Sequence, residues 1–329
     1  MHRFAWFVIA CITLIATALA APPPEEIVQG LYEGTIRDAK GTRKLEARVV
    51  ATGDLALKVF IRVPQPGGKV AKIELDGKIE GGGARFTGTY GNQEIKAAYL
   101  AGVIKGTCGT GGRLEMKRVV RESPTLGAKP PARSGRMAGA IVLLGGKDFS
   151  EVVKKPLKGG KEQEWITVEG GGIQIPKGGL QSKRQFDGSF RLHVEFKCPL
   201  VAKARGQERG NSGVYLPCGQ EIQVLDSFGM TTYTGGGCGG LYKYKDPDAF
   251  DQFSLASLPP LQWQTYDVLY RVKKVGGKAT GNPVITVLHN GIKIHDNHEL
   301  KKKARPGGFS FQDHGNPVHY RNIWVLPLN

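Results

Sequence analysis

The sequence lacks the patterns that identify several common protein classes. It has only 5 Cys, 4 Met and 4 Trp in 329 residues. Neither Cys-x-x-Cys nor Cys-x-x-His spacing occurs, so the usual structural zinc sites are not indicated. The Gly-x-Ser-x-Gly elbow of many serine hydrolases is also absent. After the first twenty residues no apolar run approaches the length of a membrane span, so we expect no integral membrane association.

Glycine and proline are abundant instead, at 47 and 19 residues. Both residues end or bend secondary structure, which excludes long coiled coils and favours many short strands. A length of 329 residues is comfortable for two domains. The composition therefore predicts an all-β protein of two domains. The net charge of +17 is compatible with nucleic acid, an anionic surface or solubility alone.

Residues 1–20 resemble a signal peptide. A short basic start precedes the apolar run from Phe4 to Leu19, and Ala18-Leu19-Ala20 is a small-x-small cleavage site. We therefore expect an exported protein, located in the periplasm, in the cell envelope or outside the cell. Export argues against nucleic acid as a partner, whatever the net charge.

The remaining chain divides at a proline-rich segment. Residues 27–122 show short alternating runs cut by glycine turns, which predict a small antiparallel β domain. Residues 123–137 form a Pro-rich linker. Residues 138–329 contain longer alternating strands and an Asn290-Gly291 hairpin turn, which predict a two-sheet sandwich or jelly roll.

One polar cluster interrupts the apolar strands between residues 209 and 226. Glu221 and Gln223 share one face of a predicted strand, opposite Ile222 and Val224, because side chains alternate along a strand. Such a strand can line a polar groove above a dry core. The alternative is an ordinary solvated outer face.

A second cluster spans residues 309–318. Gln312 and His314 fall on one face by parity, and Asp313 falls on the other. Histidine titrates near neutral pH and can transfer protons or bind metals. The alternatives are a hydrogen-bonded structural histidine and simple turn chemistry in the Asp-His-Gly-Asn-Pro run.

Cys218 and Cys238 flank one predicted strand and are a candidate disulfide pair in an exported protein. Spacing alone leaves open whether they pair.

Short motifs in a fixed order connect these clusters to a known family. They are Gly145-Gly146-Lys147-Asp148-Phe149, the run from Trp165 to Gly171, the run from Gly210 to Leu216, the run from Glu221 to Asp226, Gly240-Leu241-Tyr242, the run from Trp263 to Tyr266, the run from Gln312 to Gly315, and the run from Arg321 to Leu328. Together they resemble the 3-keto-disaccharide hydrolase domain family, which implies a concanavalin A-like sandwich over about residues 138–328. The first of these motifs lacks the Asn that the family usually has at the start of the domain, and Gln264 replaces the Asn of a usual Trp-Asn pair.

The resemblance implies a substrate, a glycoside or oligosaccharide oxidised to a ketone at C3, and roles for particular residues. Glu221 or His314 would transfer the proton, and Asn211, Gln223 and Gln312 would donate hydrogen bonds to the sugar or to an oxyanion. Asp226 and Asp313 would orient these groups or help to hold a divalent cation. Other implied substrate contacts are Arg209, Lys183, Arg184, Tyr242 and Trp263.

Two non-enzymatic alternatives remain open. A lectin-like module would use the same sandwich without turnover, with Tyr242 and Trp263 stacking on sugar rings. A cell-envelope scaffold would be held to anionic polysaccharide by charge.

Overall fold

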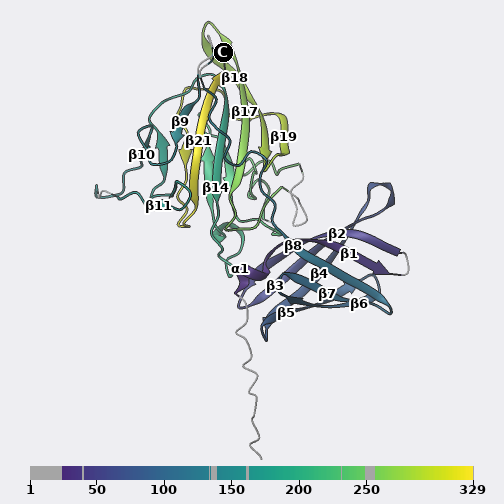
Figure 1. Ribbon diagram of the computed structural model, residues 1–329. Helices are drawn as coiled ribbons and strands as arrows, with labels where there is room; N and C mark the ends of the chain where they lie inside the picture. The colour runs from purple at the N-terminus through teal and green to yellow at the C-terminus, as the bar shows by residue number, and fades with distance from the viewer. Residues whose placement is uncertain are drawn as a thin grey trace, which may run out of the picture.

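The computed structural model describes residues 24–38, 41–132, 134, 139–160, 163–230, 232–248 and 256–328. The expected signal peptide, residues 1–20, lies outside these residues. Within them, no helix has the length and apolar character needed to cross a membrane. Two β units follow one another along the chain, drawn in purple to blue and in teal to yellow in Figure 1. The predicted fold class, a two-sheet sandwich preceded by a small antiparallel β domain, is confirmed.

The first unit is a closed antiparallel barrel of eight strands in sequence order. A short helix, α1 (Glu25–Val28), precedes it. The strands are β1 (Gly30–Asp38), β2 (Gly41–Gly53), β3 (Ala56–Pro64), β4 (Val70–Glu80), β5 (Gly83–Tyr90), β6 (Gln93–Leu100), β7 (Val103–Cys108) and β8 (Gly112–Val119), with the 3-10 turn η1 (Pro66–Gly68) before β4. The β1–β8 pairing closes the barrel, and alternate apolar side chains such as Val59 and Ile61 fill its interior. Full closure leaves no open sheet edge.

The second unit is a sandwich of two sheets. The smaller sheet has the order β10 (Val152–Lys154), β13 (Leu180–Ser182), β20 (Ser310–Phe311), β15 (Ser212–Tyr215) and β16 (Glu221–Val224). The larger sheet has the order β11 (Thr167–Val168), β12 (Gly172–Gln174), β21 (His319–Leu328), β14 (Ser189–Lys197), β17 (Gln264–Val275), β18 (Lys278–His289) and β19 (Ile292–Glu299), and β9 (Ile141–Leu144) also pairs with β21. The 3-10 turn η2 (Gly206–Glu208) precedes β15.

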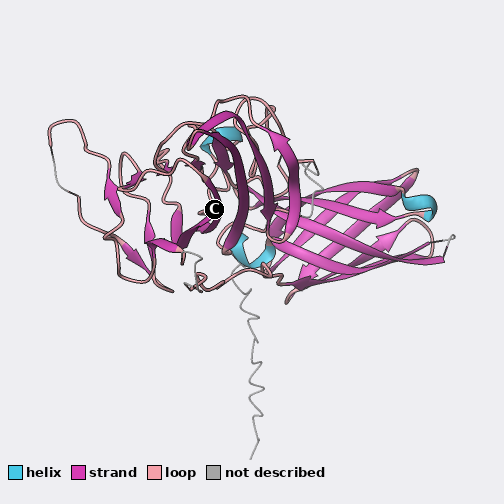
Figure 2. Cartoon of the chain, turned by 90° about the horizontal axis from the view of Figure 1, so that it is seen from above, coloured by secondary structure: helices cyan, strands magenta, loops and turns pink. Residues whose placement is uncertain are grey.

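Side chains that alternate along the strands build the core between the two sheets. Leu192, Val194 and Phe196 of β14 face Ile222 and Val224 of β16 across this core, and all five are buried. The side chains between them therefore point away from the core, on the outer face of each sheet. Figure 2 shows how strands dominate both units, with loops gathered at the ends of the sandwich.

The β18–β19 hairpin turns at Asn290-Gly291, as the sequence predicts. Both residues have positive φ, 50° and 78°, which is the backbone that a tight hairpin of this kind requires. A Cβ at Gly291 would lie 2.5 Å from a ring carbon of Pro124, so the proline-rich segment packs against this turn.

That segment lies along the outer face of the larger sheet. The Ser123 hydroxyl is 2.6 Å from the Thr265 hydroxyl, and the Thr125 hydroxyl donates to Asp267 at 2.6 Å. The Gly127 amide donates to a Glu195 carboxylate oxygen, also at 2.6 Å. The residues expected to form a linker therefore cover part of the sandwich.

The barrel and the sandwich share a small apolar cluster. Leu31, Val50 and Phe60 of the barrel pack with Phe228 and Leu258 of the sandwich. The barrel therefore contacts the loop that directly follows β16, the strand that carries Glu221.

The candidate disulfide between Cys218 and Cys238 is not formed in this structure, in which both thiols are free and buried. The Cys238 thiol lies 3.0 Å from the Tyr266 hydroxyl, whereas the Cys218 thiol interacts with Tyr270. These tyrosines are four residues apart on β17, or roughly 13 Å along a strand. The two cysteines are thus held at different places, whereas bridged cysteines need Cα atoms within about 7 Å.

Candidate functional site

Glu221 and Tyr215 form the centre of the candidate site. They are directly opposite one another in the β15–β16 ladder and point to the outer face of the smaller sheet, because their sequence neighbours Val214 and Ile222 enter the core. Their side chains are hydrogen-bonded to each other. The parity argument from the sequence placed Glu221 on this face, but it did not identify Tyr215.

Gly213 provides the space for the Glu221 carboxyl group. A Cβ at residue 213 would lie only 2.0 Å from Glu221 Oε1, so the carboxyl lies over the bare backbone of β15. Any larger residue at this position would have to displace the carboxyl group.

Glu221 is buried but has few partners. Burial raises the pKa of its carboxyl to about 6, and the hydrogen bond to Tyr215 and the nearby Lys302 and Lys243 only partly oppose this rise. Burial and the adjacent Glu221 also raise the pKa of Tyr215, which therefore remains protonated. A carboxyl group with a pKa near neutrality can accept and return a proton, as general catalysis requires.

Tyr242 borders the site on the other side of β16. Its backbone amide donates to the Glu221 carbonyl oxygen at 3.1 Å, and its hydroxyl accepts a hydrogen bond from the Tyr233 hydroxyl at 2.9 Å. The Lys243 ammonium lies 5.3 Å from the centre of the Tyr242 ring. Tyr242 is half-buried, so its ring borders the Glu221 region as a rim residue would.

Gln312 directly follows β20 and contacts Tyr215. Its amide nitrogen Nε2 donates to the Tyr215 hydroxyl at 3.3 Å, and its backbone amide donates to the Gly213 carbonyl at 2.9 Å. The structure thus brings three predicted residues, Glu221, Gln312 and Tyr242, together around Tyr215.

His314 is exposed in the loop that follows Gln312, and it makes no hydrogen bond or ion pair with the described residues. Asn316 anchors the far side of this loop, since its side-chain oxygen accepts from the Asn211 amide at 2.7 Å. Asp313 accepts from the amides of Gly178 and Gly315, both at 2.9 Å. Asp313 therefore shapes the loop that carries the exposed His314.

Asn211 and Gln223 lie on the same outer face as Glu221, but Gln207 covers both of them. Gln223 Nε2 donates to the Gln207 side-chain oxygen at 2.7 Å, and Asn211 Nδ2 donates to the Gln207 carbonyl at 2.8 Å. Both residues are almost completely buried. The expectation that they donate to a sugar needs correction, because these amides bind the chain's own Gln207.

Arg209 and Asp226 form a buried ion pair, with Arg209 Nε 2.8 Å from Asp226 Oδ2. Arg209 also donates to the Ala51 carbonyl of the barrel at 3.2 Å. Arg209 was expected at the rim and Asp226 in catalysis. Both expectations are wrong, because the pair is 1–2% exposed and connects the sandwich to the barrel.

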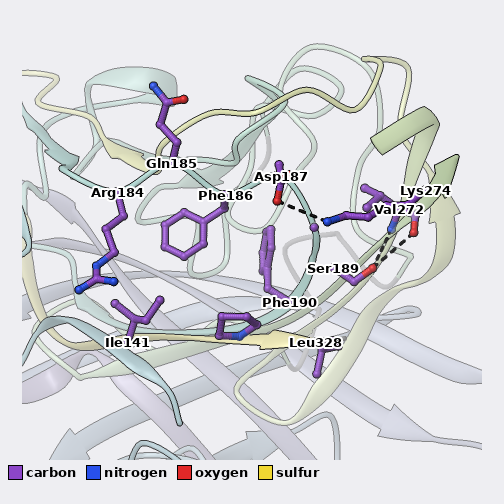
Figure 3. A pocket seen from close by; sticks show the side chains of 12 residues that line it. Ile141, Arg184, Gln185, Phe186, Asp187, Ser189, Phe190, Val272, Lys274 and Leu328 are labelled. Atoms are coloured by element: carbon purple, nitrogen blue, oxygen red, sulfur yellow. Dashed lines mark hydrogen bonds and ion pairs between the residues drawn. The ribbon is translucent and has the colours of Figure 1, made fainter. Parts of the chain in front are cut away.

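Arg184 and Lys183 lie at the end of β13 near Glu151. Arg184 forms a two-point ion pair with Glu151, at 2.7 and 2.8 Å, and the Lys183 amide donates to the Glu151 carbonyl. Arg184 also lines a hollow of about 580 Å³ at one end of the sandwich. Figure 3 shows the Phe186 and Phe190 rings there, with Asp187 facing Lys274. Lys183 and Arg184 follow β13, which is two strands from β15 in the smaller sheet, and Arg184 is held by Glu151 rather than by Glu221, Tyr215 or Gln312.

Trp263 lies on the opposite face of the sandwich, just before β17. The Arg321 guanidinium is 4.1 Å from a ring centre of Trp263 and the Lys197 ammonium 5.1 Å, and both residues come from the larger sheet. The expectation that Trp263 contacts the same substrate as Glu221 is therefore wrong.

Within the described residues, no three His, Cys, Asp or Glu side chains converge as a metal site would require. The two aspartates considered as cation ligands have other partners, Asp226 with Arg209 and Asp313 with two backbone amides.

A family model of the 3-keto-alpha-glucoside-1,2-lyase-like domain matches residues 139–326, more than half of the chain. The chain belongs to this family. The predicted resemblance is therefore confirmed, over nearly the range that the motifs indicated. No curated protein matches the chain.

Two solved structures are similar to this member of the lyase-like family. One is a "putative glycosyl hydrolase" from Parabacteroides distasonis, 31% identical, with a TM-score of 0.48; the match covers 61% of this chain and 90% of that one. The other is a xylan beta-1,4-xylosidase from Bacillus halodurans, 11% identical, with a TM-score of 0.31; the match covers 89% of this chain and 76% of that one.

Sequence reasoning missed several residues of the lyase-like domain's site. Tyr215 and Gly213 belong to a motif that the sequence analysis quoted, but their register opposite Glu221 and Gln223 is a pairing between two strands, which alternation along one strand does not give. Lys302 lies in a basic run and Lys243 follows Tyr242, but nothing local shows that both face Glu221.

Proposed function

We propose that the protein cleaves glycosides already oxidised to a ketone at C3, with Glu221 as the main proton-transfer group. The observation that supports this most is the Glu221 carboxyl itself. It is buried above Gly213, hydrogen-bonded to Tyr215, and has a pKa raised by burial to about 6. Membership of a 3-keto-glucoside lyase-like family supports the same choice of substrate.

The chemistry follows from the ketone. A carbonyl at C3 acidifies the C2 proton, so a carboxylate can remove that proton and leave an enolate on the C3 oxygen. The enolate electrons then form the C1–C2 double bond as the C1–O bond breaks, and the released alcohol takes up a proton. Water adds across this double bond, its hydroxyl to C1 and a proton to C2, which completes a net hydrolysis.

The residues around Glu221 suit these steps. Glu221 must be ionised to take the C2 proton, and its pKa of about 6 allows this at neutral pH. The second N–H of the Gln312 amide is a neutral donor that can hold the C3 oxygen as negative charge develops, and the Tyr215 O–H becomes free to do the same once Glu221 has taken up the proton. His314 is the candidate for protonating the leaving group, and the Tyr242 ring can stack on a sugar face.

The test is release of the aglycone from a 3-keto-glucoside by the purified protein. We expect release by the wild type, a loss of about 10²–10⁴-fold in Glu221→Gln, and a smaller loss in His314→Ala. Trp263→Ala is a control on the opposite face and should retain release. Binding of the glycoside without release would contradict the proposal and favour a lectin-like module.

A further inference from the structure

Two cationic side chains converge on the turn that joins β15 to β16. The Lys302 ammonium donates a hydrogen bond to the Gly219 carbonyl oxygen. The Arg305 guanidinium approaches the same glycine, because a Cβ at Gly219 would lie 2.9 Å from Arg305 Nη2 and 3.7 Å from Lys302 Nζ. Two like charges are thus held close together at Gly219, which lies two residues before Glu221 along the chain.

A third cation lies on the other side of Glu221. Lys243 follows Tyr242, whose backbone is hydrogen-bonded to that of Glu221, and both Lys243 and Lys302 act electrostatically on the Glu221 carboxyl. We name Lys243, Lys302 and Arg305 the cationic rim. Among the described residues, no carboxylate forms an ion pair with any of them.

Some cations elsewhere on the sandwich are instead paired with nearby carboxylates. Lys245, for example, pairs with Asp248, and Lys293 pairs with Asp296. Lys243 and Lys302 act electrostatically on the Glu221 carboxyl, which is neutral for part of its titration near pH 6. Unpaired like charges repel each other, and an anion that binds between them relieves this repulsion.

We propose that the cationic rim binds an anionic substituent of the glycoside, a carboxylate or sulfate carried by the leaving group, so that the protein prefers acidic glycosides. The inference rests on the proposed function, because it places the reacting sugar over Glu221 and Tyr215. Lys302 and Arg305 lie at the turn next to this pair, and in this proposal the leaving group extends towards that turn. Three cations attract such an anion without a dedicated pocket, and salt screens this attraction.

The experiment compares two 3-keto-glucosides that differ only in charge, one with a 3-carboxyphenyl aglycone and one with the corresponding carboxamide. We expect kcat/KM for the acid to exceed that for the amide by about five- to tenfold at low salt, and the ratio to approach one at about 0.5 M NaCl. The double variant Lys302→Gln/Arg305→Gln should lower the ratio to about one. The double variant Lys117→Gln/Lys278→Gln removes the same charge from exposed positions elsewhere and should keep the wild-type ratio.

Several results would overturn the inference. These are a wild-type ratio of one at low salt, a ratio unchanged in Lys302→Gln/Arg305→Gln, or an equal fall of the ratio in the control variant. A 3-keto-glucuronide with a neutral aglycone provides a further arm, and a preference for it alone would place the anion on the sugar and contradict the leaving-group assignment.

Calorimetric binding of the two unoxidised glucosides separates this inference from the proposed function. Preferential binding of the acid, lost in Lys302→Gln/Arg305→Gln, supports the cationic rim even if neither ketone is cleaved. Cleavage of both ketones with no charge preference leaves the proposed function standing and contradicts the rim.

Discussion

The sandwich carries a buried glutamate on each of its outer faces, and their surroundings are opposite. Glu195, on the larger sheet, receives hydrogen bonds from Arg321 at 2.6 Å, Asn322 at 2.8 Å and the Gly127 amide at 2.6 Å, and is 3.4 Å from His193. Burial opposes its ionisation, but these partners lower its pKa to about 2. Glu221, on the smaller sheet, has Tyr215 as its hydrogen-bond partner and a pKa raised by burial to about 6.

Burial is therefore a poor guide to reactivity by itself. A buried carboxylate with several donors is held permanently ionised and stabilises the fold, whereas one with a single neutral donor has its pKa raised towards neutrality. His193, between Asp267 at 2.7 Å and Glu195, resembles part of a catalytic triad. Residues 123–128 cover this group, and their hydrogen bonds to it mark it as structural.

The largest expected difference between the two glutamates is in activity. Glu221→Gln should lower aglycone release by about 10²–10⁴-fold, because the amide cannot accept the C2 proton. Glu195→Gln should keep release near the wild-type level under conditions where it is folded. Rate measurements on both variants, with circular dichroism to verify folding, check this contrast. Equal losses of aglycone release in the two variants would contradict the assignment of a catalytic role to Glu221 and a structural role to Glu195.

The reverse contrast is expected in stability. Glu195→Gln should lower the free energy of unfolding at pH 7 by about 3 kcal/mol, since it removes the carboxylate that Arg321 and His193 surround. The folded pKa of Glu195 lies below its ordinary value of 4.5, so its contribution is present above pH 4.5 and is lost as the pH falls towards about 2. Urea unfolding at pH 7 and pH 3 measures it, and a constant difference between wild type and variant would contradict this assignment.

A smaller effect is expected from Gly213→Ala. The added methyl group would meet Glu221 Oε1 at 2.0 Å and must displace the carboxyl, so kcat should fall by about tenfold or more. Gly188→Ala is the matched control, because its Cβ would meet only the end of the Lys274 side chain at 3.4 Å. Wild-type kinetics for Gly213→Ala would show that the carboxyl position is not critical.

A change of opposite sign to that of Glu195→Gln is expected in the free energy of unfolding of Glu221→Gln. The folded pKa of Glu221 is raised above 4.5, so its favourable contribution is present below pH 4.5 and is lost as the pH rises through about 6. An uncharged glutamine avoids this loss, and the variant should be about 2 kcal/mol more stable than wild type at pH 8 but not at pH 4. Thermal unfolding at both pH values tests this sign, which is opposite to that of Glu195→Gln.

Strand periodicity was enough to predict the fold class and the face on which Glu221 lies. Alternation also placed Ile222 and Val224 in the core, and the Asn290-Gly291 hairpin formed as its residues require. Each of these depends on neighbours in the sequence.

The errors concern contacts between distant segments. Arg209 looked like a rim residue, but its partners are Asp226 and the barrel carbonyl of Ala51, 158 residues away. Trp263 lies on the outer face of the larger sheet, near Arg321. Alternation along β17 predicts which side chains share a face of that strand, but it does not show on which side of the sandwich β16 lies. Gln207 accepts hydrogen bonds from the side-chain amides of Gln223 and Asn211. The η2 turn places Gln207 over these residues, and no local sequence pattern indicates this.

Isotope incorporation at C2 is the most direct test of the central role of Glu221. The protein is incubated with a 3-keto-glucoside in D₂O, and the released sugar is examined by NMR early in the reaction. The account predicts deuterium at C2 with the wild type, and neither release nor exchange above background with Glu221→Gln. Release of a sugar that retains its C2 proton, or wild-type exchange by Glu221→Gln, would contradict it.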